Sequence, residues 1–309
     1  MDKIKKGMDR FFHRLWINKS AILKQACTYT GLSFTVWGFI SLFVSLTDYV
    51  PKDISFFYRV ILGCVLVVCI FILSIFVAAC RVLCTGSICV GESTSKNGVY
   101  VKYGDMFSPD SVENGYNGKR FLVVSVNRCF DTTIDDHLVS LKTQHGKAFQ
   151  ELYDNKVYTP SSLNDVITHA LSNNASYQTL STKDKPEGNL RRYETGTTVT
   201  IRVNSELSYF LLGLSYFDEH LNAQTSKADF SIAVQRLIEY SNQNAQGYPV
   251  ILPLLGSGMA RTNIELTNIL NYLVQAFAIN KNIINNDFHI VVWKGDKHRV
   301  SISDLRKWL

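Results

Sequence analysis

The chain has 309 residues, of which 46% are hydrophobic, and this is enough for one large domain or two smaller ones. Its formal net charge is +6, and the seven lysines and arginines minus the two aspartates before residue 25 already give +5. A nucleic-acid-binding domain carries a basic face of its own, and no such stripe follows residue 90, so nucleic acid is excluded as the expected partner.

Two uncharged apolar segments follow the basic arm of residues 1–24. The first, CTYTGLSFTVWGFISLFVSL, covers residues 27–46, and the second, VILGCVLVVCIFILSIFVAA, covers residues 60–79. Each has about the 20 residues that a helix needs to cross a bilayer. The first is the weaker candidate because it carries several Thr and Ser residues. We expect two transmembrane helices within residues 25–84.

The position of the basic arm predicts the orientation of these spans. An excess of Lys and Arg marks the cytoplasmic side. Two spans return the chain to that side, so both the N-terminus and the C-terminal domain are expected in the cytoplasm, below the bacterial inner membrane. The seven cysteines include no Cys-x-x-Cys pair, which agrees with a reducing compartment. Cysteines beside the second span are either lipidated or unreactive thiols.

The rest of the chain, residues 95–309, alternates strand-like and helix-like segments. Continuous apolar runs at 121–127 and 249–256 are typical of buried central strands. The alternation predicts an α/β fold with a parallel or mixed sheet between helices. The other expected elements are strands at 99–107, 197–217 and 288–293, helices at 161–174, 228–243 and 263–280, and a polar excursion or edge hairpin at 175–198.

Loops at the ends of the apolar strands are the candidate ligand sites. In an open α/β sheet, ligands bind beyond the carboxyl ends of the strands. The loop Gly256-Ser257-Gly258 ends one strand and leads into a helix, so a diphosphate could approach its backbone and meet the free N–H groups of the helix N-terminus. The alternative is a glycine-rich turn without a ligand. The loop is neither a P-loop nor a dinucleotide fingerprint.

Three short motifs occur in the order found in macrodomains. They are Gly-Asp-Met at 104–106, an apolar strand ending in Val-Asn at 126–127, and LLGSGMAR at 254–261. On these motifs, residues 97–295 resemble the macrodomain family. The resemblance implies that Asp105 accepts a hydrogen bond from the adenine amino group of ADP-ribose, and that the Gly-Ser-Gly loop wraps its diphosphate. A turn aspartate is the alternative for Asp105.

The first loop departs from the family pattern. Hydrolytic macrodomains usually continue Asn-Ala-Ala-Asn and then a run of glycines, whereas this chain has NRCFDTTIDDHLVSLKTQHGKAF at 127–149. The second asparagine is absent, and only Gly146 remains of the glycine run. The pattern favours a binding protein without a cofactor over an enzyme. The alternatives are a membrane-tethered ADP-ribosyl hydrolase or deacylase, and a structural membrane protein that binds a protein partner.

The form NRCFDT followed by QHG after two spans is similar to one macrodomain subgroup, the membrane-anchored effectors of type II Thoeris antiphage systems. The resemblance implies that the domain binds an ADP-ribose-derived messenger, in this subgroup a histidine adduct. A partner TIR-domain enzyme would make it from NAD. The effector would then assemble as a homo-oligomer, disrupt the membrane lipid and stop growth of the infected cell.

The expected ligand site combines these loops. Arg261 would pair with the diphosphate, and Trp293 would stack on the nucleotide unless it packs in the core. Asp131 would recognise a positive group on the messenger unless it caps the loop. The expected ligand-binding residues are Asp105, Met106, Asn127, Arg128, Cys129, Phe130, Asp131, Thr132, His145, Gly146, Leu255, Gly256, Ser257, Gly258, Met259, Ala260, Arg261, Trp293 and Lys294.

Overall fold

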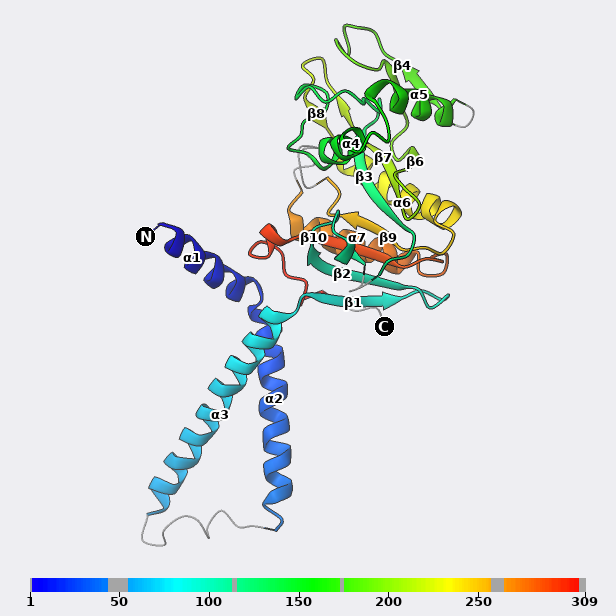
Figure 1. The fold of residues 1–309 in the computed structure, drawn as a ribbon. Helices are drawn as coiled ribbons and strands as arrows, with labels where there is room; N and C mark the ends of the chain where they lie inside the picture. Colours follow the sequence, from blue (N-terminus) through cyan, green and yellow to red (C-terminus); the bar gives the residue numbers. More distant parts are fainter. Residues whose placement is uncertain (1, 44–54, 113–115, 173–174, 257–263, 306–309) are drawn as a thin grey trace. The chain divides into compact units, whose positions relative to one another are not determined.

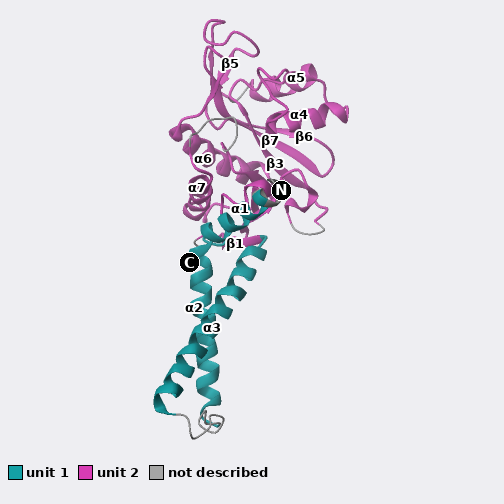
Figure 2. Cartoon of the chain, turned by 90° about the vertical axis from the view of Figure 1, so that its left-hand side faces the viewer, with its two compact units in different colours: residues 1–86, 301–304 teal, residues 87–300, 305–309 magenta. Residues whose placement is uncertain are grey.

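The chain folds into two compact units. The computed structural model describes residues 2–43, 55–112, 116–172, 175–256 and 264–305 (Figure 1). The first unit contains residues 1–86 with 301–304, and the second contains residues 87–300 with 305–309 (Figure 2). The boundary at residue 86 lies between the end of the predicted spans and the start of the predicted ligand-binding domain.

The described part of the first unit is helical. Helices α2 and α3 pack through small side chains, since Ala26 and Ala78 are fully buried where the two helices meet. Arg81 Nη1 of α3 also donates to the Tyr29 hydroxyl of α2 at 2.8 Å. The helices are α1 (Asp2–Ile17), α2 (Lys19–Ile40) and α3 (Phe56–Cys84).

Within the described residues, α3 is the one helix that is both long and apolar enough to cross a membrane. The prediction of two spans is therefore not confirmed. Helix α2 begins with Lys19 and ends at Ile40, whereas the first predicted span continues to Leu46, outside the described residues. Residues 2–17, predicted only as a basic arm, form the helix α1.

The second unit is built on a mixed sheet, which confirms the predicted α/β fold. In the described residues the order is β1-β2-β10-β9-β3-β7-β6, and β8 pairs with β7 off this path. The central strands β2, β10, β9, β3 and β7 are parallel, and β1, β6 and β8 are antiparallel to their neighbours. The strands are β1 (Ser87–Glu92), β2 (Gly98–Gly104), β3 (Arg120–Asn127), β6 (Thr198–Arg202), β7 (Leu207–Phe217), β8 (Ala223–Gln224), β9 (Val250–Pro253) and β10 (Phe288–Trp293).

Helices cover both faces of this sheet. Strand β3 is buried on both sides, so its residues alternate between two cores. Leu122 and Val124 face the cluster that contains Phe149 and Leu163. The helices on this face are α4 (Gln144–Asp154) and α5 (Pro160–Leu171).

The opposite face carries an aromatic core. Phe121 of β3 stacks on Phe210 of β7 with ring centroids 4.4 Å apart, and Phe210 contacts Tyr240 of α6 at 5.2 Å. Phe277 of α7 contacts Phe288 of β10 at 4.5 Å. The helices on this face are α6 (Lys227–Asn244) and α7 (Leu266–Ile279).

Most predicted elements of this unit are present. The polar excursion contains the predicted hairpin, formed by the antiparallel strands β4 (Tyr177–Thr179) and β5 (Arg191–Tyr193). Strand β1 and helix α4 were not predicted. In α5, Leu163 and Ile167 are buried, whereas Val166 is 40% exposed.

Candidate ligand-binding site

A cavity of about 630 Å³ lies at the carboxyl ends of the parallel strands. Residues from the ends of β2, β3, β7, β9 and β10 all contribute to its lining. Parallel strands bring their carboxyl ends to one edge of a sheet, and ligand sites form there because loops rather than strands occupy the edge. The lining also includes the segment of residues 136–147, which leads into α4.

The cavity brings together part of the predicted site. Leu255 and Lys294 are not among its lining residues, and neither are residues 128–132 or Gly146. Ser257, Gly258, Met259, Ala260 and Arg261 lie outside the described residues. The predicted residues that do line it are Asp105, Met106, Asn127, His145, Gly256 and Trp293.

Asn127 organises the first loop and faces the cavity. Its Oδ1 accepts hydrogen bonds from the backbone N–H of Cys129 at 3.0 Å and of Asp131 at 3.4 Å. Phe130, inside this turn, has a left-handed φ of 53°. Asn127 Nδ2 is buried and has no hydrogen-bond partner among the described residues. This amide can therefore donate to a ligand without breaking a protein contact.

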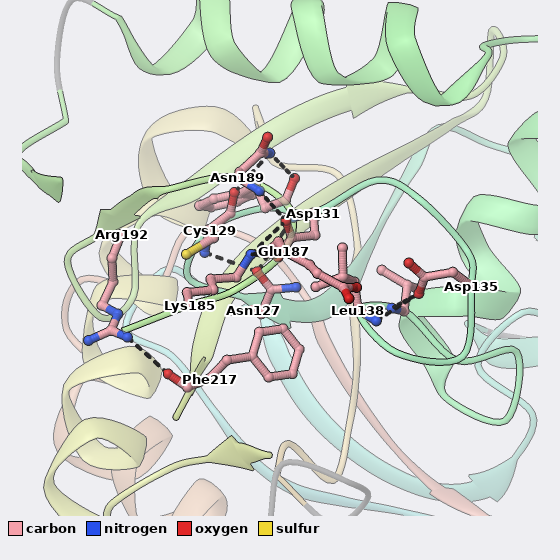
Figure 3. A network of polar contacts seen from close by, with 12 residues as sticks. Asn127, Cys129, Asp131, Asp135, Leu138, Lys185, Glu187, Asn189, Arg192 and Phe217 are labelled. Atoms are coloured by element: carbon pink, nitrogen blue, oxygen red, sulfur yellow. Dashed lines mark hydrogen bonds and ion pairs between the residues drawn. The ribbon is translucent and has the colours of Figure 1, made fainter. Parts of the chain in front are cut away.

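Asp131 points away from the cavity into a buried polar network (Figure 3). Its carboxylate lies 3.0 Å from Lys185 Nζ and accepts from the Asn189 backbone N–H at 2.7 Å. Burial raises the pKa of the Asp131 carboxyl, while the Lys185 ammonium and the Asn189 N–H oppose that rise. Asp131 thus holds the polar excursion against the first loop, which fits its alternative role of loop capping.

The other residues of this loop also have internal partners. Arg128 Nε donates to the Tyr193 carbonyl at 2.8 Å, and Thr132 Oγ1 donates to the Pro160 carbonyl at 2.9 Å. Burial raises the pKa of the Cys129 thiol to about 11, so this thiol is not a nucleophile at neutral pH. These contacts fix residues 128–132, and within residues 127–132 Asn127 is the one that lines the cavity.

Helix α4 begins at the cavity wall. Its N-cap, Thr143, accepts the Gly146 N–H at 3.0 Å. Gly146 is required because an added Cβ would collide with the Ser140 carbonyl oxygen. His145, in the first turn, meets Phe149 edge-on with ring centroids 4.4 Å apart.

His145 is a neutral imidazole on the cavity lining. Burial lowers its pKa to about 3, and a hydrogen bond to the backbone of Asp131 opposes this shift. Its Nε2 is buried and has no partner among the described residues. His145 and Asn127 therefore each offer the cavity an unused polar atom.

Two basic side chains flank the start of α4. Lys142 and Lys147 are exposed and line the cavity. Together with the positive end of the helix, they favour an anionic ligand. The sequence analysis missed them, although a threonine N-cap between two lysines is a readable signal for such a site.

Trp293 and Asp105 lie at the ends of two neighbouring strands. Trp293 is paired with Gly104 in the register of β10 and β2. Trp293 is 63% exposed, so it is not packed in the core, and its ring covers Gly295. Asp105 is exposed and its Oδ1 accepts the Phe107 N–H at 3.1 Å, as in a turn. An aromatic face and a carboxylate thus stand side by side on the cavity lining.

The end of β7 completes the lining and was also missed. This part of the lining consists of Phe217, Leu221 and Asn222. Asp136, from the segment of residues 136–147, also lines the cavity, and its carboxylate accepts a hydrogen bond from Ser140 Oγ at 2.7 Å. The sequence predicted strand β7 but not a ligand loop after it. The same rule for strand ends would have included it.

The chain is similar to the following known proteins. The family model for the macro domain of the Thoeris protein ThsA matches residues 99–293. The Thoeris protein ThsA of Bacillus amyloliquefaciens (strain Y2) is 23% identical over 216 residues, which cover 68% of this chain and 67% of that protein. The macrodomain of Mycobacterium tuberculosis DarG has 14% identity and a TM-score of 0.36, covering 62% of this chain and 96% of that chain. A mutant Oceanobacillus iheyensis macrodomain with ADPR has 10% identity and a TM-score of 0.34, covering 69% and 92%.

Proposed function

Because the chain belongs to the family of ThsA macro domains of Thoeris proteins, we propose that it is a membrane-anchored effector of a bacterial antiphage system. Its α/β domain binds an ADP-ribose-derived messenger of the histidine-adduct type. A partner TIR-domain protein makes this messenger from NAD during infection. Binding favours a homo-oligomeric state that disrupts the inner membrane, because a ligand shifts the population toward the state that it binds more tightly.

One observation carries the ligand-binding proposal. Asn127 Nδ2 and His145 Nε2 are buried, lack partners among the described residues, and belong to residues that line one cavity. A buried polar atom without a partner costs about 1–3 kcal/mol, and a ligand that supplies the partner recovers this free energy. The cavity of about 630 Å³ is in the size range of small-molecule sites.

The lining suggests how the messenger is oriented. Asp105 accepts from the adenine amino group, and Trp293 stacks on the base. The diphosphate lies over the loop that starts at Gly256, whose left-handed φ of 72° requires glycine. The rest of this motif, including Arg261, lies outside the described residues. The ribose and its attached group lie toward Asn127, His145 and the lysines beside α4.

The geometry of the first loop supports binding rather than hydrolysis. A hydrolase of ADP-ribose esters needs a carboxylate that can position a water near the ribose. Asp131 is held by Lys185 and Asn189 and does not line the cavity, and Asp136, which does line it, accepts from Ser140 Oγ at 2.7 Å. The proposal therefore assigns no catalytic residue to this loop.

Helix α3 supports membrane anchoring, and we assign α2 as the second membrane-spanning helix. Only 6% of the most apolar 18-residue stretch of α3 is buried in the protein, and such an exposed apolar surface suits a lipid environment rather than water. In α2, Thr28, Ser33 and Thr35 each donate to the carbonyl four residues earlier, at 2.9–3.0 Å. Hydroxyls satisfied within the helix remove an obstacle to insertion. We place both helices in the membrane with the α/β domain in the cytoplasm.

A growth assay tests this function. The chain is co-expressed with the messenger-producing TIR protein, and growth arrest is followed after activation. We expect Asp105→Ala and Gly258→Glu to abolish arrest while the protein stays in the membrane fraction. The matched control is Asp110→Ala, an exposed aspartate outside the cavity lining, which should keep arrest intact. Arrest that survives Gly258→Glu would contradict the diphosphate-loop assignment.

A further inference from the structure

Helix α1 has two chemically different faces. At 3.6 residues per turn, six of its seven large apolar residues fall in one arc of about 140°, and Ile17 is the exception. Four of its five basic residues, at positions 3, 6, 10 and 14, fall opposite, whereas Lys5 falls within the apolar arc. Periodicity of this kind marks a helix that lies along a boundary between polar and apolar surroundings. The apolar positions are Ile4, Met8, Phe11, Phe12, Leu15 and Trp16.

The apolar face is largely uncovered in the described structure. Phe11 is 49% exposed, Phe12 61% and Trp16 66%. Aromatic side chains gathered on one helix face are costly to leave in water and mark an interaction surface. The helix is also short and carries Gly7, so packing against a partner rather than intrinsic propensity must stabilise it.

The C-terminal end of α1 is tied to the end of α3. Arg14 Nη2 donates to the Leu83 carbonyl at 2.9 Å, and Leu15 packs against the cluster that contains Ala78 and Val82. Helix α1 leaves the α2–α3 pair at this end, inclined to both helices (Figure 1). If α3 spans the bilayer, the C-terminal end of α1 lies at the level where α3 emerges on the cytoplasmic side.

The charge of α1 selects the kind of surface that covers it. The helix contains five lysines and arginines and two aspartates, a balance of five minus two, or +3. Lys19 also stands over the Trp16 ring at 3.7 Å, a cation–π contact. Two copies of a helix with this charge repel each other, whereas an anionic bilayer surface attracts it by about fivefold in affinity per basic residue.

We propose that α1 is a membrane-surface helix that binds anionic phospholipid headgroups beside the α3 span. Its aromatic side chains enter the boundary between headgroups and acyl chains, and its basic face meets the phosphates. This inference rests on the proposed anchoring by α3. It adds that the lipid composition of the inner leaflet controls the order of the first 17 residues.

The test is amide hydrogen exchange on the full chain, one copy per lipid nanodisc. Discs of phosphatidylcholine alone are compared with discs that also contain phosphatidylglycerol. We expect exchange within residues 2–17 to slow at least about tenfold in the anionic discs, and high salt to reverse this change. Equal exchange in both kinds of disc would overturn the inference.

Matched substitutions and an internal reference complete the test. Phe12→Ser on the apolar face should abolish the lipid-dependent protection, and Gly7→Ser on the other face, where no atom lies within 4 Å of the added Cβ, should keep it. Loss of protection in both variants alike would overturn the inference.

Residues 60–79 of α3 serve as an internal reference and should stay protected from exchange in both kinds of disc. If they exchange freely, the anchoring itself fails, whereas protected residues 60–79 with an unprotected α1 refute this inference alone.

Discussion

Asp131 and Lys185 form an ion pair in which neither side chain is more than 2% exposed, with 3.0 Å between carboxylate oxygen and ammonium nitrogen. The pair joins the first loop after β3 to the polar excursion between α5 and β6. Lys185 Nζ also donates to the Glu187 carbonyl at 2.5 Å. A charged contact this deeply buried fixes the position of the loop that carries Asn127.

Breaking this pair should destabilise the α/β domain strongly. In Lys185→Met the Asp131 carboxylate loses its cation and stays buried, which costs about 3–5 kcal/mol. The measurement is heat denaturation of the detergent-solubilised full chain at pH 7. The loss should shrink at acidic pH, because a buried carboxyl without its cation has a raised pKa and becomes neutral.

Two variants control this prediction. Lys183→Met changes an exposed lysine of the same loop and should leave the melting temperature unchanged. The double variant Asp131→Asn/Lys185→Met removes both charges and should recover most of the loss. Equal melting of Lys185→Met and Lys183→Met would show that the pair does not hold the loop.

His289 predicts a specific acid sensitivity. It stacks on Tyr100 with ring centroids 5.0 Å apart, and neither ring nitrogen has a partner among the described residues. Burial lowers its pKa from 6.5 to about 4. Between these values the unfolded chain binds a proton that the folded chain does not, so stability falls as the pH falls, by up to about 1.4 kcal/mol per pH unit.

His289→Phe should remove this contribution. At pH 7 the free energy of unfolding of the variant should exceed that of the natural chain by about 1 kcal/mol, because the unpaired polar atoms of the imidazole are removed from the core. It should lose less stability between pH 6.5 and pH 4, measured by heat denaturation. His220→Phe, at an exposed site, is the control. A variant with the same acid loss as the natural chain would refute the assignment.

Trp293 should contribute to binding without contributing to stability. Its ring is 63% exposed and belongs to the cavity lining. Stacking of a base on an aromatic ring is worth about 1–3 kcal/mol, so Trp293→Ala should weaken messenger binding by a factor of about 5 to 150. The melting temperature should not change. Ile279→Ala, at an 81% exposed site outside the cavity lining, should alter neither property. Unchanged affinity in Trp293→Ala would remove the stacking role.

The sheet was readable from the sequence because its central strands are buried on both faces. Strands β3 and β9 lie in continuous apolar runs, and the spacing in α6 and α7 is regular. Helix α4 was missed because its short sequence starts with Gln144, His145 and Gly146 in a polar stretch, so the cap at Thr143 decides its start. The apolar spacing of α1 is difficult to recognise in the sequence because five lysines and arginines interrupt it.

The candidate site was only partly readable because several partners are distant in sequence. Lys185 is 54 residues from Asp131, and nothing local to Asp131 shows that its carboxylate is already paired. Exposure of Trp293 likewise depends on Gly295 and on the strand register. In contrast, Asn127 ends an apolar strand, so the rule for strand ends located it, and Asp105 was predicted from its Gly-Asp-Met motif.

The most direct test of the central claim is calorimetric titration of the full chain in detergent with ADP-ribose, its histidine adduct and NAD. We predict tight binding of the histidine adduct, weaker binding of NAD, no turnover of any of them, and loss of binding in Asp105→Ala but not in Asp110→Ala. Absence of binding to all three would contradict the claim that the cavity between Asn127, His145 and Trp293 is a receptor for an ADP-ribose messenger.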